Sequence, residues 1–352
     1  MAKEQDVLDA LRQVEDPDLH RDIVSLGFVQ DVDVRDGHIG VRIVLTTPAC
    51  PVRDQMKTQI EEILRGLPDV REVDVAMDAQ VRSSAPMGKQ QPVEGVRNII
   101  AVASNKGGVG KSTVAVNLAV ALAKRGAAVG LLDADVTGPN VPIMMGFQAG
   151  FMAEEGGLRA EEKYGVRLVS LGFVLPKLSP VVWRGPMVGT AVRQLLHDIK
   201  WGELDYLLID LPPGTSDASL TMAQDAPISG VVIVSTPADV AWEDATKAVA
   251  MFDKLNVPVF GVIENMSYFV CPHCNERTEI FGHGGGRRAA DELGLEFLGE
   301  IPLDQKTREG ADSGVPIVES DPESIQGQAF MRVAEQVAAR CSTLQFATAG
   351  VQ

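Results

Sequence analysis

Hydrophobic positions in the first part of the chain follow two different periods. Val7–Val14 and Val52–Leu67 carry apolar residues at the spacing of an amphipathic helix. Ile39–Leu45 and Val70–Met77 instead alternate in the way of a half-buried strand. Helices mixed with short strands predict a small α/β domain over residues 1–80.

The next stretch has a different composition. Residues 78–95 are small and polar, include Pro and Gly, and show no periodicity. This composition favours an interdomain linker, which we place at residues 81–95. The alternative is a long surface loop within one domain.

From Asn98 onward, short apolar runs rich in β-branched residues alternate with helical patterns. The expected strands are residues 98–104, 127–133, 166–172, 206–212, 230–236, 259–265 and 297–302. Continuous apolar strands separated by helices predict an α/β fold, a mostly parallel sheet with helices on both faces. We place this second domain at residues 96–345 and expect the tail Cys341–Gln352 to be frayed.

The composition of the chain argues against several classes of protein. The net charge of −16 over 352 residues argues against a broad basic face for nucleic acid. The chain starts without an apolar secretory segment, and no run approaches the roughly 18 apolar residues of a membrane span. Four scattered cysteines do not make a disulfide framework. We therefore expect a cytoplasmic protein without membrane or nucleic-acid partners.

The segment "ASNKGGVGKST" follows the first of these strands and opens a helix. Glycines there let backbone N–H groups converge on phosphate oxygens, and the helix N-terminus favours negative charge. In such a loop Lys111 reaches the β- and γ-phosphates of ATP, Ser112 binds Mg²⁺, and Thr113 caps the α-phosphate. The expected nucleotide contacts are Asn105, Lys106, Gly107, Gly108, Val109, Gly110, Lys111, Ser112 and Thr113.

Carboxylates stand at the ends of two other strands. Asp133 and Asp135 end the second predicted strand, and Asp210 follows an apolar run. Ligands gather at the carboxyl edge of a parallel sheet, so Asp210 is expected to hold Mg²⁺ through water. For any one of them, the alternative is an ordinary strand-end cap.

The phosphate loop departs from the simple pattern at one position. Asn105 stands where the pattern has glycine, and a second lysine, Lys106, precedes the glycine pair. This K-G-G-x-G-K-[ST] form resembles the deviant Walker A loop of the MinD/ParA/nitrogenase-iron-protein class. The resemblance implies that Lys106 reaches a partner's phosphates across a nucleotide-sandwich homodimer.

The same resemblance implies roles for polar residues beyond the loop. It assigns Asp135 to orienting the attacking water and Asp133, with Ser112 and Asp210, to the Mg²⁺ site. It places Asn265 and the turn Ile301–Asp304 beside the adenine. The implied catalytic residues are Lys106, Lys111 and Asp135.

Several motifs are more specific. "DADVTGPNVPIMMG", "WRGPMV", "DYLLIDLPPGTSD" and "VIENMSYFVCPHC" together resemble the Mrp/ApbC iron–sulfur cluster carrier ATPases over residues 96–340. Glycine is the commonest residue of that family at the position of Asn105. The resemblance implies a [4Fe–4S] cluster received from a donor and delivered to recipient apoproteins, with slow ATP hydrolysis.

The first domain resembles the small domain of iron–sulfur assembly factors, through "EDPDLHRDIVSLGFV" and "TTPACPVRDQM". Its Cys50 precedes an amphipathic helix whose N-terminus is expected to lower the pKa of the thiol. Cys50 is either a transient cluster or partner contact, or a small hydrophobic residue under a turn.

Three interpretations compete for Cys271 and Cys274. A dithiol redox couple normally opens a helix of a thioredoxin-like fold, which this context is not. A structural zinc site needs two more ligands, for which His273 or His283 are candidates at an unusual spacing. In a two-fold homodimer four thiolates meet, which suits a [4Fe–4S] cluster, as the family resemblance also implies.

Two functions follow from these interpretations. The first is an ATP-dependent cluster carrier. The second is a nucleotide-switched ATPase of the partition or positioning type with a structural zinc site. Partition ATPases need basic surface, and positioning ATPases carry a basic amphipathic C-terminal helix. Here Glu323–Cys341 has only two basic residues, Arg332 and Arg340, and we expect it to pack on the sheet.

Overall fold

A computed structural model describes residues 3–84, 90–135, 138–147, 152–154, 157–173, 185–214 and 217–348. Outside this range lie parts of three expected motifs, at residues 136–137, 183–184 and 215–216, and residues 85–89 of the expected linker. The chain forms two compact units, residues 1–82 with 338–352, and residues 83–337. From the sequence we expected residues 338–345 in the second domain, whereas in the structure they belong to the first unit.

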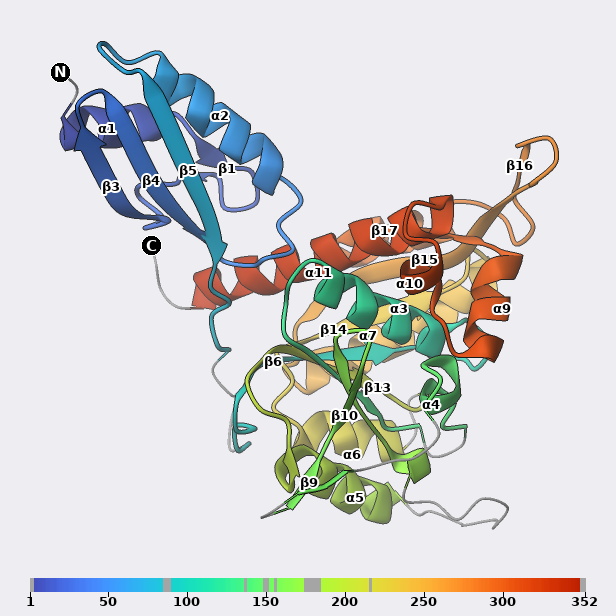
Figure 1. The fold of residues 1–352 in the computed structure, drawn as a ribbon. Helices are drawn as coiled ribbons and strands as arrows, with labels where there is room; N and C mark the ends of the chain where they lie inside the picture. Colours follow the sequence, from blue (N-terminus) through green and yellow to red (C-terminus); the bar gives the residue numbers. More distant parts are fainter. Residues whose placement is uncertain are drawn as a thin grey trace. The chain divides into compact units, whose positions relative to one another are not determined.

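The first unit is a three-stranded sheet with two helices (Figure 1). Strand β3 (Val29–Arg35) pairs antiparallel with β4 (His38–Leu45), which pairs parallel with β5 (Glu72–Ala79). The helices are α1 (Glu4–Leu11) and α2 (Arg53–Arg65), and β1 (Glu15–Asp16) pairs with β2 (Arg21–Asp22). Strand β3 was not predicted, because a bulge between Val29 and Asp31 breaks its alternation.

The end of the last helix belongs to this unit. Helix α11 (Ile325–Thr348) continues through the tail that was expected to fray, so that expectation is wrong as far as Thr348. The Phe346 ring is 6 % exposed and lies edge-on to Phe28, with 6.2 Å between ring centroids. The Arg82 guanidinium lies 4.1 Å from the centroid of the same ring. Burial of this ring explains why the tail stays helical.

The second unit is built on a mostly parallel sheet, which confirms the predicted fold class (Figure 1). Its strand order is β10-β11-β7-β13-β6-β14-β15-β16, and β17 pairs with β15. Neighbours are parallel except at the short strands β10 and β16, which pair antiparallel. The bounds are β6 (Val96–Ala103), β7 (Val129–Asp133), β10 (Glu161–Lys163), β11 (Val166–Ser170), β13 (Leu204–Asp210), β14 (Gly230–Ser235), β15 (Val259–Val270), β16 (Arg277–Thr278) and β17 (Phe297–Leu303).

Helices cover both faces of this sheet. In β6, Ile99 and Ala101 share a core with helices α5 to α8, whereas the alternate residues Ile100 and Val102 are fully buried against the opposite face. The helices are α3 (Lys111–Lys124), α4 (Val141–Met144), α5 (Gly185–His197), α6 (Asp217–Asp225), α7 (Asp239–Lys254), α8 (Gly285–Leu293), α9 (Gln305–Ser313), α10 (Ile317–Ser320) and the first part of α11. A small sheet contains β8 (Met152–Glu154), β9 (Gly157–Arg159) and β12 (Ile199–Lys200). Among the described helices, none has the length and apolarity needed to cross a membrane.

Candidate functional site

The phosphate loop joins the end of β6 to the start of α3, as the sequence predicts. Gly108 and Gly110 have φ angles of +82° and +83°, a region that favours glycine. A Cβ at Gly110 would lie 2.2 Å from the Asn265 amide nitrogen. Two features therefore require glycine at position 110: its positive φ angle and the close approach of Asn265 from β15.

Lys111 and Asp210 form the centre of the site. Lys111 Nζ lies 2.5 Å from Asp210 Oδ1, and Ser112 Oγ donates to Asp210 Oδ2 across 2.5 Å. The Lys111 side chain is 6 % exposed and Asp210 is fully buried. Burial raises the pKa of Asp210, and the charge of Lys111 opposes that effect. Asp210 thus binds the two side chains expected to hold phosphate and Mg²⁺.

Asp133 and Asp135 lie beside this pair at the same edge of the sheet. Asp133 Oδ2 accepts from Ser170 Oγ across 2.9 Å, and Asp133 Oδ1 accepts from the Asp135 backbone N–H across 3.2 Å. Burial, and then the negative charge of Asp210, raise the pKa of Asp133 to about 7. The site therefore concentrates more buried acid than its one buried ammonium can neutralise.

This imbalance fits a magnesium-bound nucleotide. Asp133, Asp135 and Asp210 are all less than 9 % exposed, and Lys111 is the one buried lysine among the described residues, so a bound cation would relieve the repulsion between the carboxylates. Among the described residues no three metal-ligating side chains converge into a preformed metal cage. That suits Mg²⁺, which is commonly held by one or two protein oxygens together with substrate phosphates. Lys106 is exposed at the loop tip, where a residue that reaches toward another molecule must lie.

The side chain of Asn265, a residue of β15, contacts the phosphate loop. Its Nδ2 donates to the Val109 carbonyl across 2.8 Å, and the side chain is 5 % exposed. The Asp304 carboxylate, also expected near the adenine, caps α9 by accepting from the Thr307 backbone N–H across 3.0 Å. Asn265 is therefore in the site, while the hydrogen bonds of Asp304 are those of a helix cap.

The cysteine pair continues directly from the same strand. Cys271 follows the end of β15, and its backbone N–H donates to the Glu276 carbonyl across 3.0 Å, which closes the hairpin to β16. Hydrogen bonds from the backbone N–H groups of His273 and Cys274 lower the pKa of the Cys271 thiol. The turn thus favours a thiolate, the form that binds metal.

The base of this hairpin is tied to the sheet. The Arg277 guanidinium stacks on the Tyr268 ring at 3.8 Å and lies 3.6 Å from Glu300 of β17. His283 Nδ1 lies 3.4 Å from Glu279, and no described histidine joins the cysteines in a metal-binding group. Within the described part of the chain, the hairpin therefore presents two thiols that no third metal-binding side chain joins.

A buried glutamate that the sequence analysis missed supports this region. Glu264 is 1 % exposed and accepts from the Gly286 backbone N–H across 2.5 Å and from Ser267 Oγ across 2.6 Å. It ties the N-terminus of α8, which begins at Gly285, to β15. A lone charge inside the apolar run "VFGVIEN" was the signal.

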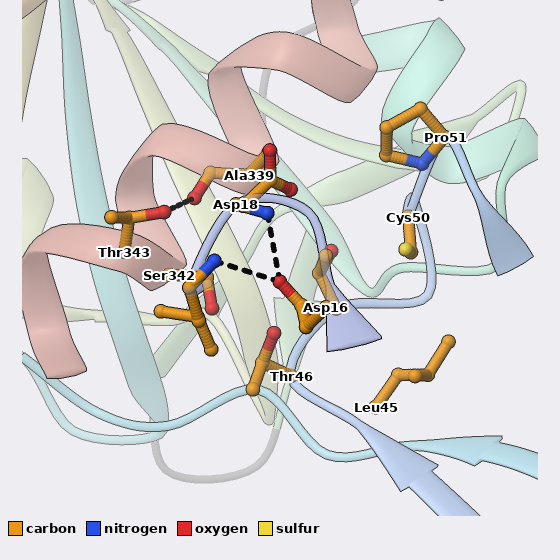
Figure 2. Close-up of a pocket in the computed structure, with 11 residues that line it drawn as sticks. Asp16, Asp18, Leu45, Thr46, Cys50, Pro51, Ala339, Ser342 and Thr343 are labelled. Carbon is orange, nitrogen blue, oxygen red and sulfur yellow. Dashed lines mark hydrogen bonds between the residues drawn. The ribbon is translucent and has the colours of Figure 1, made fainter. Parts of the chain in front are cut away.

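The first unit has a cavity beside Cys50. Its volume is about 10 Å³, room for about one water molecule. Figure 2 shows Asp16, Thr46 and Cys50 on its wall; Asp16 Oδ1 accepts from the backbone N–H groups of Asp18 and Leu19.

All four cysteines of the chain are free thiols. Burial raises the pKa of Cys341 to about 12, which disfavours its thiolate.

Comparison with known proteins identifies both parts of the chain. Residues 95–338 match the family described as NUBPL iron-transfer P-loop NTPase, and residues 4–75 match the iron-sulfur cluster assembly protein family. The iron-sulfur cluster carrier protein of Synechocystis sp. is 45% identical over 96% of this chain and 97% of its own length. That of Deinococcus radiodurans is 47% identical over 96% and 95%, respectively.

Solved structures agree with the fold. A nucleotide-binding protein from Archaeoglobus fulgidus, in complex with ADP, is 42% identical, with a TM-score of 0.57, over 63% of this chain and 88% of its own. The cell division ATPase MinD of Pyrococcus furiosus has a TM-score of 0.52 at 24% identity over 68% of this chain and 98% of its own. The MinD likeness concerns the fold alone.

Proposed function

Because this chain belongs to the family of NUBPL-type iron-transfer P-loop NTPases, we propose that it carries a [4Fe–4S] cluster between two copies of itself and delivers it to apoproteins under the control of ATP. A cluster donor supplies the cargo. The observation that carries the proposal is the path of β15, which contacts the phosphate loop through Asn265 and ends at Val270, directly before Cys271.

ATP enters this account through the Lys111–Asp210 pair. Lys111 transfers from Asp210 to the β- and γ-phosphates, which frees the Asp210 carboxylate and the Ser112 hydroxyl to hold Mg²⁺. Asn105, Val109, Thr113 and the loop glycines surround the phosphates, and Asn265 lies within reach of the base. Mg²⁺ neutralises charge on the transferred phosphoryl group.

Hydrolysis requires an oriented water and a neutralised transition state. Asp135 lies at the same edge of the sheet as Asp133, and we assign it to orienting the water. Lys106, exposed at the loop tip, reaches the phosphates of the partner subunit. Because that lysine comes from the second copy, hydrolysis depends on dimerisation and is slow without it.

The cargo site follows from thiol count. Four thiolates hold a [4Fe–4S] cluster, and one chain presents two at the hairpin, Cys271 and Cys274. A two-fold dimer supplies the other two. The hydrogen bonds that lower the pKa of Cys271 favour its thiolate, and the thiolate is the form that binds the cluster.

The alternative of a membrane-positioning ATPase is not supported by α11. Residues Phe330, Val333 and Val337 of that helix are each about 1 % exposed and pack inside the second unit. An interfacial helix needs an apolar face free to enter the lipid.

A transfer assay tests the proposal. The protein is reconstituted anaerobically with iron and sulfide, and mixed with an apoenzyme whose activity requires a [4Fe–4S] cluster. We expect a brown protein that activates the acceptor, with a rate that changes when Mg²⁺–ATP is added. A colourless protein that retains stoichiometric zinc would contradict the proposal.

A further inference from the structure

An exposed apolar turn follows the cysteine pair. The Gly282 backbone N–H donates to the Glu279 carbonyl across 3.5 Å, so Ile280 and Phe281 occupy the two central positions of a turn. Gly, Pro, Asn, Asp and Ser dominate such positions. Here the side chains are large and apolar, and Ile280 and Phe281 remain 51% and 45% exposed. The conformation of the turn therefore does not explain why these two positions carry large apolar side chains.

This turn belongs to a segment that has no core of its own. Residues 272–283 are all exposed, and Figure 1 shows the β16 end of the hairpin extending beyond the neighbouring helices of the second unit. A two-stranded hairpin is marginally stable in water unless its apolar side chains find a partner. The contacts of Arg277 with Tyr268 and Glu300 hold β16, which directly precedes the apolar turn, in place on the sheet.

We propose that Ile280 and Phe281 pack against the same residues of a second copy of this chain and form an apolar rim around the shared cluster. The proposal rests on the proposed function, since it takes the four-thiolate dimer as its centre. It adds the surface that holds the two copies together and keeps water from the cluster.

The reach of the segment supports this occupant. Ile280 lies four residues after Glu276, so the Cα atoms of these two residues are at most about 14 Å apart. The Glu276 carbonyl binds the Cys271 N–H, so Glu276 lies directly across the hairpin from the first cysteine. An interface of standard size covers about 800 Å² on each partner, a patch with a radius of about 16 Å. An interface of this size centred on the thiols therefore extends to the neighbourhood of Ile280, which lies near its edge.

The net charge of the segment around the cysteines also favours a second copy of this chain as the partner. Between Cys271 and Arg288 the chain has two acidic residues, Glu276 and Glu279, and three basic ones, Arg277, Arg287 and Arg288, for a net charge of +1. The whole chain carries −16. In a two-fold interface each residue meets a region of identical charge, so most of this acidic surface would repel itself. The segment that bears the thiols is close to neutral.

The test is the double variant I280S/F281S, with I325S as the matched control because Ile325 is 49% exposed on α11. Dimer dissociation is measured by sedimentation on cluster-loaded, nucleotide-free protein, and cluster loss by the decay of visible absorbance after adding an iron chelator. We expect at least about tenfold weaker dimerisation and faster cluster loss in I280S/F281S only. The conservative variant I280V/F281L should behave as wild type.

The outcomes separate the two proposals. If wild type forms the cluster-bridged dimer and I280S/F281S matches it in both measurements, the apolar rim is wrong while the carrier function stands. If wild type never forms a cluster-bridged dimer, the proposed function itself fails. Unchanged ATP binding in I280S/F281S checks that the variant is folded, as expected for two exposed residues.

Discussion

The Asn265 amide donates to the Val109 carbonyl across 2.8 Å, so the strand that ends at the cysteine pair contacts the phosphate loop. Asn265 and Cys271 are six residues apart on one continuous segment. On the proposed function, a change in the loop on nucleotide binding is expected to act on the strand that leads to the thiols. Glu264, next in sequence, links the same strand to α8 through Gly286.

Removing this contact should uncouple the two sites. In Asn265→Ala we expect cluster transfer without nucleotide to stay within about twofold of wild type, while the effect of Mg²⁺–ATP on the transfer rate disappears. The measurement is the transfer rate with and without nucleotide, at saturating Mg²⁺–ATP so that weaker binding does not matter. A full nucleotide response in the variant would show that coupling takes another route.

Lys111→Ala should abolish ATP hydrolysis, with a loss of at least about 10²-fold, because the variant lacks the charge that stabilises the transferred phosphoryl group. Lys124→Ala is the matched control, since that lysine lies on the same helix and pairs with Glu319 across 2.8 Å. Phosphate release is measured on both. Wild-type hydrolysis by Lys111→Ala in a clean preparation would contradict the assigned role.

The pH dependence of nucleotide binding follows from Asp133. Its pKa is about 7 in the free protein, so Asp133 carries a proton below that pH. Bound Mg²⁺ favours the carboxylate and expels the proton. Affinity for Mg²⁺–ATP should therefore rise as pH increases toward about 7 and level off above it.

Calorimetry near pH 6 in two buffers of different ionisation enthalpy measures this proton release directly. We expect release in wild type that falls toward zero near pH 8. In Asp133→Asn the contribution of this residue is absent, so the release is smaller. Identical heats in both buffers near pH 6 would show that binding releases no proton and would contradict the assigned titration of Asp133.

The four cysteines should separate into two classes. Cys271→Ser and Cys274→Ser should lose the visible absorbance of the reconstituted protein, whereas Cys341→Ser should keep it because that thiol is buried and protonated. Cys50→Ser tests the first unit: an unchanged spectrum removes a cluster-ligand role for Cys50 and leaves a partner contact open. Absorbance spectra of all four variants, prepared in parallel, decide these assignments.

Phe346 provides a stability prediction. Phe346→Ala should destabilise the first unit by about 3 kcal/mol, because it leaves a cavity beside Phe28 and removes the ring under Arg82. Urea unfolding followed by circular dichroism measures the loss. Phe346→Leu should cost less, and equal stability of Phe346→Ala would mean that the tail does not support this unit.

The sequence was most informative where one local pattern determines one structure. Each of the seven apolar runs predicted in the second unit forms a parallel strand in the described part of the chain, because burial on both faces gives such a strand a continuous apolar sequence. Strand β3 was missed because its bulge breaks the alternation, and the burial of Phe346 was missed because it depends on Phe28, which is distant in sequence. The Asn265–Val109 contact joins residues 156 positions apart, and no spacing rule reveals it.

Native mass spectrometry of the anaerobically reconstituted protein tests the central claim most directly, because it counts chains and metal atoms in one particle. We predict a species of twice the chain mass of 37.6 kDa that carries one Fe₄S₄ unit and is absent in Cys271→Ser. A single chain with one zinc ion, or a dimer whose metal content survives that substitution, would contradict the claim.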